Sequence, residues 1–212
     1  TMLDSMRTLF AGLLKAKGKD AASAALFNEA GRLSQIFRPI ETSGKPWAAA
    51  INGLALAGAF ELTLACHYRV ASDNPKTRLG LPEIQVGLFP GAGGTQRLAR
   101  MLQPTDALTI MLKGEQLKLD RARSLKLVDA IVPAADLIKA AKDWIKGGGK
   151  ATAPWDEKGF KVPVPVYSKQ GMMVFPAATA LYRKETYDNY PAARAIMQSV
   201  YEGLMLPMDA AL

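Results

Sequence analysis

The chain has 212 residues: 49% are apolar, 27 are Lys or Arg, 19 are Asp or Glu, and there is one His and one Cys. This apolar fraction supports a folded core and excludes a disordered chain. A single cysteine and a single histidine exclude a disulfide framework and any metal site built from several Cys or His ligands. Apolar runs stop well short of the roughly 18 residues of a membrane span, and no signal peptide opens the chain. We therefore expect a globular protein of a reducing compartment.

The net charge of +8 needs an explanation. Lys and Arg recur at helical spacings instead of clustering, which is typical of solvated helix faces. A nucleic-acid surface would need clustered basic residues interleaved with exposed aromatics, and aromatics are only 8% of the chain. The basic surplus instead leaves room for a modest basic rim around a phosphorylated ligand.

Apolar periodicity predicts two helices at the start of the chain, over residues 2–16 and 20–38, and the residues 43–46 (SGKP) end the second. The segments that follow, in chain order, are a short buried strand over 47–51, a helix over 60–66 and extended pieces over 68–71 and 80–86. Helices over 95–102, 105–112 and 119–125 then lead to a strand over 127–132 and an amphipathic helix over 134–146. This alternation of strands and helices predicts an α/β fold.

Three consecutive glycines, 147–149, mark a change in composition. Residues 150–168 are rich in proline and read as a linker with extended segments. Helices are predicted over 176–187 and 191–203, each with a proline in its first turn, and 209–212 begins another. We therefore divide the chain into 1–149 and 150–212. The chain begins at Thr1 and has few strands for a complete sheet, so we expect a piece of a longer protein, incomplete at its N-terminal side.

Two acidic residues stand alone in apolar segments. Glu61 is the only acidic residue between Glu41 and Asp73, and Glu83 is the only one between Asp73 and Asp106. A buried carboxyl group has a raised pKa, which suits proton transfer near neutral pH. The pair therefore indicates acid–base chemistry. Pairing with an arginine, or a place on an exposed face, is the structural alternative for either residue.

Glycines lie next to both acidic residues. Gly58 directly precedes the apolar helix that carries Glu61, so its N–H belongs to the unpaired donors of a helix start. Such a donor can stabilise an oxyanion, and the missing side chain admits a substrate carbonyl. Residues 90–94 (PGAGG) open another helix, but Gln96 stands where a dinucleotide-binding fingerprint needs its third glycine, so no NAD site is expected. Tight turning alone is the alternative role of these glycines.

Two stretches carry a family resemblance. Residues 45–66 (KPWAAAINGLALAGAFELTLAC) and 79–98 (LGLPEIQVGLFPGAGGTQRL) resemble the two signatures of the enoyl-CoA hydratase (crotonase) family. Residues 104–146 resemble its later helices more loosely. Residues 150–212 are similar to the connection in multifunctional fatty-acid oxidation proteins (alpha subunits), where the hydratase part precedes a 3-hydroxyacyl-CoA dehydrogenase part. The resemblance implies a ClpP/crotonase spiral fold that lacks its N-terminal part and has a C-terminal extension of linker and helices.

The resemblance also implies roles for individual residues. Glu61 and Glu83 correspond to the catalytic acid/base pair around one water, and Gly58 to one N–H of the oxyanion hole and a substrate contact. Pro82 and Gly91 correspond to substrate-binding positions, no metal is implied, and the second oxyanion donor would lie upstream of residue 1. The chain departs from the family's glycine run at 57–59 (AGA), whose methyl groups would tighten the turn and narrow the acyl pocket. His67 stands where an aspartate is commoner and is interpreted as structural.

The implied function is hydration of trans-2-enoyl-CoA to 3-hydroxyacyl-CoA in the β-oxidation of fatty acids. Hydration needs no cofactor beyond the coenzyme A carried by the substrate, and NAD would serve only a dehydrogenase portion that is absent from this chain. The implied setting is the bacterial cytoplasm, in an oligomer that includes a thiolase subunit, without nucleic acid or a membrane span. Three alternatives stay open: an enoyl-CoA isomerase, a non-catalytic basic module that binds RNA, and an inactive fragment.

Overall fold

A computed structural model describes residues 2–212, apart from the side chains of residues 2, 3, 5, 6, 17 and 30. The α-helices are α1 (Met2–Thr42), α2 (Gly58–Leu64), α3 (Gly94–Met101), α4 (Pro104–Lys113), α5 (Leu119–Ser124), α6 (Leu137–Lys146), α7 (Lys169–Thr186), α8 (Pro191–Gly203) and α9 (Met208–Ala211). The strands are β1 (Ala48–Ile51), β2 (Leu54–Leu56), β3 (Tyr68–Ser72), β4 (Arg78–Gly80) and β5 (Ala130–Val132). Three short 3₁₀ helices, η1 (Pro82–Val86), η2 (Ala134–Asp136) and η3 (Pro154–Asp156), complete the set.

The strands form two small parallel sheets, one in the order β1-β3-β5 and one that pairs β2 with β4. Ala50 pairs with Val70, which in turn pairs with Ala130, and Ala55 pairs with Leu79. Parallel strands need crossover connections, and here β2 and α2 lie in the chain between the paired strands β1 and β3. The α/β prediction is confirmed. Strand β2 was not predicted, because three residues after a turn carry too little periodicity.

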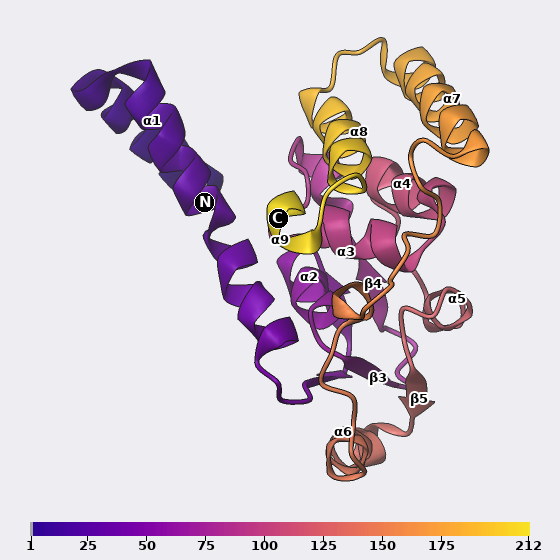
Figure 1. The fold of residues 1–212 in the computed structure, drawn as a ribbon. Coiled ribbons are helices and arrows are strands. Elements are labelled where there is room, and N and C mark those ends of the chain that lie inside the picture. Colours follow the sequence, from indigo (N-terminus) through magenta and orange to yellow (C-terminus); the bar gives the residue numbers. More distant parts are fainter. Residues whose placement is uncertain (1) are drawn as a thin grey trace.

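The predicted pair of N-terminal helices is confirmed. Gly18, at φ 79° and ψ 173°, interrupts α1, and the second half continues through Pro39 to Thr42. Figure 1 shows α1 (indigo) extending away from the rest of the molecule. Its C-terminal end is anchored by Phe37, which packs with Ala65 and Ala92 in a small separate cluster.

The main core lies between the sheets and the helices that follow them. Leu98 of α3, Leu108 of α4 and Ile196 and Val200 of α8 share one cluster of buried side chains. Helix α8 packs on α3 and α4, and α7 packs on α4. The helices α7 and α8 therefore lie against the helices formed by residues 94–113 (Figure 1). In the described part of the chain, no helix is long and apolar enough to cross a membrane.

Two expectations about local structure are wrong. Residues 80–86 are not extended: β4 ends at Gly80, and η1 follows because Pro82 at its first position has a φ already suited to a helical turn. Helix α7 begins at Lys169 instead of residue 176, because Ser168 caps it by accepting a hydrogen bond from Gly171 N–H at 3.1 Å. Pro176 therefore lies inside α7.

Candidate active site

Glu61 lies in the first turn of α2, with only 3% of its surface exposed. Its Oε1 accepts two backbone hydrogen bonds, from Ala92 N–H at 2.8 Å and from Gly94 N–H at 2.7 Å. No other hydrogen bond to this carboxylate occurs in the described part of the chain, so Oε2 is left without a partner. The loop before α3 therefore fixes one oxygen of Glu61 and leaves the other available.

Close packing explains why position 94 is a glycine. A Cβ at Gly94 would lie 2.8 Å from Oε1 and 2.9 Å from Cγ of Glu61, closer than real Cβ contacts. The neighbouring Gly93 has φ 90°, a conformation that favours glycine. The glycines before α3 therefore let the backbone approach the carboxylate closely enough to donate to it.

Burial dominates the electrostatics of Glu61. Loss of hydration raises its pKa, while the Gly94 and Ala92 N–H groups and the positive charge of Arg97 oppose that rise. The guanidinium of Arg97 does not pair directly with Glu61, because its ion pair is with Glu41. The structural alternative, in which Glu61 forms an ion pair with an arginine, is therefore not seen among the described residues.

Glu83 lies on η1 and is half-buried. Its Oε2 is buried and has no hydrogen-bond partner among the described residues. Burial and, to a smaller extent, the charge of Glu61 raise the pKa of Glu83 to about 7, against the opposing effect of its own backbone N–H. The fold thus brings the two acidic residues, 22 positions apart in the sequence, close enough for the charge of Glu61 to act on the protonation of Glu83.

The other predicted site residues lie in the segments that carry or contact Glu61 and Glu83. Gly58 begins α2, one helical turn before Glu61, and a Cβ built there meets nothing within 4 Å. Pro82 is the first residue of η1 and precedes Glu83. Gly91 is exposed and directly precedes Ala92, the residue whose N–H donates to Glu61.

The turn before Gly58 is held in an unusual conformation. Ala57 has φ 54° and ψ −133°, which is strained for a residue with a Cβ, by roughly 1–3 kcal/mol. Its N–H donates to Gly80 O at 2.9 Å, which ties the turn to the end of β4. The turn at Gly58 and the segment that leads to Glu83 are therefore joined by a direct hydrogen bond.

Sequence reasoning did not single out Glu41 and Arg97. Both side chains are completely buried, and they form a two-point ion pair at 2.7 Å and 3.0 Å. Arg97 also donates from Nη1 to Ala92 O at 2.8 Å, in the loop that holds Glu61. An arginine in an amphipathic helix gives no sign of such a partner, since Glu41 is 56 residues earlier.

The single histidine and cysteine lie outside this site. His67 accepts a hydrogen bond at Nδ1 from Trp47 N–H at 3.1 Å, which supports its structural interpretation. Burial raises the pKa of the Cys66 thiol to about 11, so it stays protonated and unreactive near neutral pH. Among the described residues, no group of three His, Cys, Asp or Glu side chains gathers to hold a metal ion.

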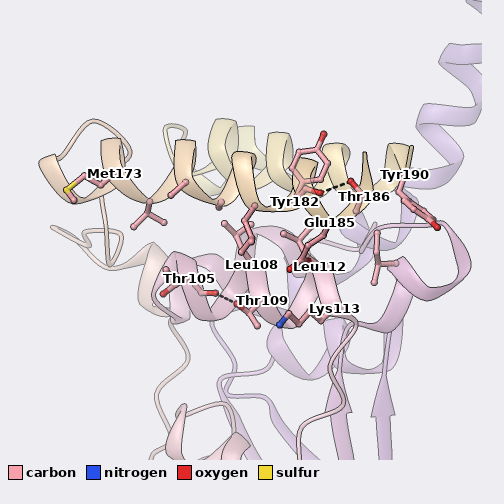
Figure 2. A pocket seen from close by; sticks show the side chains of 16 residues that line it. Thr105, Leu108, Thr109, Leu112, Lys113, Met173, Tyr182, Glu185, Thr186 and Tyr190 are labelled. Carbon is pink, nitrogen blue, oxygen red and sulfur yellow. Dashed lines mark hydrogen bonds between the residues drawn. The ribbon is translucent and has the colours of Figure 1, made fainter. Parts of the chain in front are cut away.

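A separate apolar groove of about 570 Å³ lies between α4 and α7. Figure 2 shows Leu108 and Leu112 on the side of α4 that faces α7. Ile84, the residue after Glu83, reaches one wall of the groove, but none of the predicted site residues lines it. The groove is therefore distinct from the place where the predicted site residues lie.

Comparison with known families and proteins places this geometry in context. Residues 11–150 match the family described as enoyl-CoA hydratase/isomerase. The chain is 38% identical over 194 residues to the fatty acid oxidation complex subunit alpha of Shewanella baltica, covering 92% of this chain and 27% of that protein. It is 41% identical over 187 residues to the same subunit of Vibrio parahaemolyticus, covering 84% and 26%. The chain thus spans about a quarter of the length of these relatives.

Solved structures show the same fold. An enoyl-CoA hydratase from Geobacillus kaustophilus aligns with a TM-score of 0.53 at 23% identity, covering 84% of this chain and 53% of that one. An enoyl-CoA hydratase from Bacillus anthracis aligns with a TM-score of 0.50 at 23% identity, covering 93% and 60%. The predicted crotonase-like fold class is confirmed.

Proposed function

Because the chain belongs to the enoyl-CoA hydratase/isomerase family, we propose that it hydrates trans-2-enoyl-CoA to 3-hydroxyacyl-CoA, with Glu61 and Glu83 as the catalytic carboxyl groups. One observation carries this proposal: both carboxyl groups have raised pKa values, the charge of Glu61 acts on Glu83, and each group has an oxygen without a hydrogen-bond partner in the described chain. On this proposal, the reacting water supplies the missing partner. A pKa of about 7 on Glu83 suits proton transfer at neutral pH.

Hydration requires that the thioester carbonyl be polarised, so that C3 of the enoyl group accepts a nucleophile. We assign this role to the Gly58 N–H, where the absence of a side chain leaves room for the carbonyl oxygen. A well-placed donor to a developing oxyanion contributes about 10²–10³ in rate. Pro82 and Gly91, beside Glu83 and Ala92, are the proposed substrate-contacting positions.

The two carboxyl groups then divide the proton transfers. The oxygen of water bonds to C3 while one carboxylate takes a proton from that water, and the other carboxyl group delivers a proton to C2. The elements of water are added and no electrons are lost, so the reaction requires no redox cofactor. Because the two groups titrate as a coupled pair, the acid and base roles belong to the pair and are not assigned to one residue.

The similarity to the curated relatives supports a wider setting for this reaction. Their name, fatty acid oxidation complex subunit alpha, supports a role in bacterial β-oxidation in the cytoplasm. On this proposal residues 150–212 connect the hydratase domain, 1–149, to a 3-hydroxyacyl-CoA dehydrogenase portion that uses NAD. Association with a thiolase subunit in an oligomer is part of the same proposal.

The test uses the full-length natural protein that contains this sequence, with a conjugated enoyl-CoA whose absorbance is lost on hydration. Glu61→Gln and Glu83→Gln keep the size of the side chain and remove its acid–base chemistry, so each should lower kcat by about 10³-fold or more. Glu185→Gln, in the groove between α4 and α7, is the matched control and should leave kcat unchanged.

Each outcome has a clear reading. An unchanged kcat for hydration in both glutamine variants would contradict the assignment of Glu61 and Glu83 as catalytic residues. A wild-type protein that shifts a double bond without adding water would be an isomerase, an activity that one carboxylate can support. Salt-sensitive retention of RNA without turnover would support the binding-module alternative instead.

A further inference from the structure

We propose that Arg97, clamped by Glu41, is a positioning residue for Glu61: it fixes the carbonyl of Ala92 and thereby the two backbone N–H groups that hold the catalytic carboxylate. This inference rests on the proposed function, because it assigns a role within the same site. It concerns residues that do not themselves touch the reacting atoms. It is carried by a continuous series of buried hydrogen bonds.

The series begins at the guanidinium group. Arg97 donates from Nε to Glu41 Oε1 at 2.7 Å and from Nη2 to Glu41 Oε2 at 3.0 Å. A two-point contact of this kind fixes the plane of the guanidinium. The remaining nitrogen, Nη1, is then aimed at Ala92 O, to which it donates at 2.8 Å.

Ala92 passes this constraint to Glu61. Its own N–H and the N–H of Gly94 donate to the same oxygen of the carboxylate, at 2.8 Å and 2.7 Å. The carbonyl of Ala92 lies between these two donors along the backbone. Holding that carbonyl therefore limits the rotation of the peptide groups on both sides of it, and with it the position of Glu61 Oε1.

The burial of the ion pair argues for a role beyond stability. Arg97 and Glu41 have no exposed side-chain surface, and ion pairs of this kind are often matched in stability by apolar side chains of similar volume. Glu41 is further satisfied by Arg38, which donates from Nη1 at 3.0 Å. A charged network fixes a direction in space, which an apolar contact in the same place would not do.

The positive charge of Arg97 on α3 also stabilises the ionised form of the Glu61 carboxylate that its hydrogen bonds help to position, and the loss of hydration on burial opposes that form. The charge of Glu61 in turn raises the pKa of Glu83 on η1. Glu41 is ion-paired with Arg97 and neutralises part of its charge. Removal of the positive charge should therefore make Glu61 harder to ionise and move the acid limb of the pH–rate profile to higher pH.

Arg100, one turn further along α3, provides a matched control. It is also buried and hydrogen-bonded, but its partners are Gln96 and the carbonyls of Gly203 and Leu206. These partners lie in α3 and in the C-terminal segment, and Arg100 makes no hydrogen bond to the Ala92 and Gly94 backbone that holds Glu61. Substitution of either arginine removes a buried charge and its hydrogen bonds. Only Arg97 is hydrogen-bonded to the loop that holds Glu61.

The experiment compares Arg97→Lys, Arg97→Met, Arg100→Lys and Arg100→Met in the full-length natural protein. Arg97→Lys keeps the charge and loses the fork, so kcat should fall by about 10- to 100-fold with KM within about threefold, as expected for a misplaced catalytic group. Arg97→Met should lower kcat further and move the acid limb upward. The Arg100 variants should lower the melting temperature and leave kcat and the pH profile of the folded enzyme unchanged.

Hydrogen exchange gives a readout that does not depend on activity. Backbone amides over residues 91–94 should exchange faster in both Arg97 variants than in the Arg100 variants of equal thermal stability. If Arg97→Met does not fold, Glu41→Gln replaces it, since it keeps the size of the partner and releases the guanidinium. Equal effects of Arg97 and Arg100 variants on kcat and on this exchange would overturn the inference. A wild-type protein without hydratase activity would instead overturn the proposed function, and the exchange data would still decide the role of Arg97.

Discussion

Gly94 packs directly against the carboxylate of Glu61. Gly94 combines two properties that no other residue type offers: its N–H donates to Glu61, and it has no Cβ to push that side chain away. Its φ lies outside the left-handed region, so an alanine there would be strained by contact alone. An alanine at position 94 therefore tests displacement of the carboxylate without adding strain in the backbone.

Gly94→Ala should therefore lower activity strongly. The added methyl group would lie 2.8 Å from Glu61 Oε1, so the carboxylate must move, and we expect kcat to fall by about 10²-fold. The measurement is steady-state hydration of an enoyl-CoA, with folding checked by circular dichroism. Gly31→Ala in α1, where a Cβ meets nothing within 4 Å, is the control and should keep full activity.

Glu83 makes stability depend on pH. Because its pKa rises to about 7 on folding from an ordinary value of 4.5, the folded state binds this proton more tightly than the unfolded state does. The resulting stabilisation is fully present below pH 4.5 and is lost as the pH rises through 7. Glu83→Gln should thus raise the melting temperature relative to wild type more at pH 8 than at pH 5. An equal difference at the two pH values would contradict a raised pKa.

At the scale of elements, the short strand β4 positions both halves of the site. Its last residue, Gly80, accepts the hydrogen bond from Ala57 and is followed after one residue by η1 with Glu83. A Cβ at Gly80 would lie 2.3 Å from the backbone oxygen of Glu115. A backbone atom cannot move aside as the end of a flexible side chain can.

Gly80→Ala should consequently push β4 away from the loop before α5. We expect a loss of about 1–3 kcal/mol in the free energy of unfolding, as for other overpacked sites, together with reduced hydration activity. Denaturant unfolding measures the first and the enoyl-CoA assay the second. Gly12→Ala, at another open position of α1, should change neither; an unchanged midpoint for Gly80→Ala would show that the loop adjusts freely.

Across the whole molecule, Arg38 joins three segments that are far apart in the sequence. From the end of α1 it donates to Asp156 of η3 at 2.7 Å and 2.5 Å, and to Asp209 of α9 at 2.6 Å. It also contacts Glu41, and the pKa of its guanidinium is raised by these carboxylates. The C-terminal end of α1 is thus joined to η3 and to α9 by one side chain, which also contacts Glu41 of the Glu41–Arg97 pair.

Arg38→Met should remove the hydrogen bonds that join α1 to η3 and α9. We expect a loss of about 1–3 kcal/mol in the free energy of unfolding, between the values for exposed and buried ion pairs, and faster proteolysis within residues 150–168. Added salt should reduce the difference from wild type only in part, because Asp209 is exposed whereas Glu41 is buried. Arg121→Met, which breaks an exposed pair with Asp106, should change stability by less than about 1 kcal/mol; a similar loss in both variants would contradict this role of Arg38.

The sequence alone was enough for most helices and for the candidate residues. Apolar runs, amphipathic spacing and the glycine and proline residues between them located α2, α3, α4, α5, α6 and α8. Glu61 and Glu83 were identified by their isolation among apolar residues, and Gly58 by its place before a helix. The resemblance to a known family added their roles, which stay predictions until the variants are measured.

Only the tertiary structure decided how these residues meet. The donors to Glu61 come from residues 31 and 33 positions later, and the partner of Arg97 lies 56 positions earlier. Local patterns report which face of an element is apolar, and they carry no information on which distant backbone amide or carboxylate that element will reach. The 3₁₀ helix that carries Glu83 escaped prediction for a related reason: five residues are too few for a period, so packing against α4 shapes this segment along with its own proline.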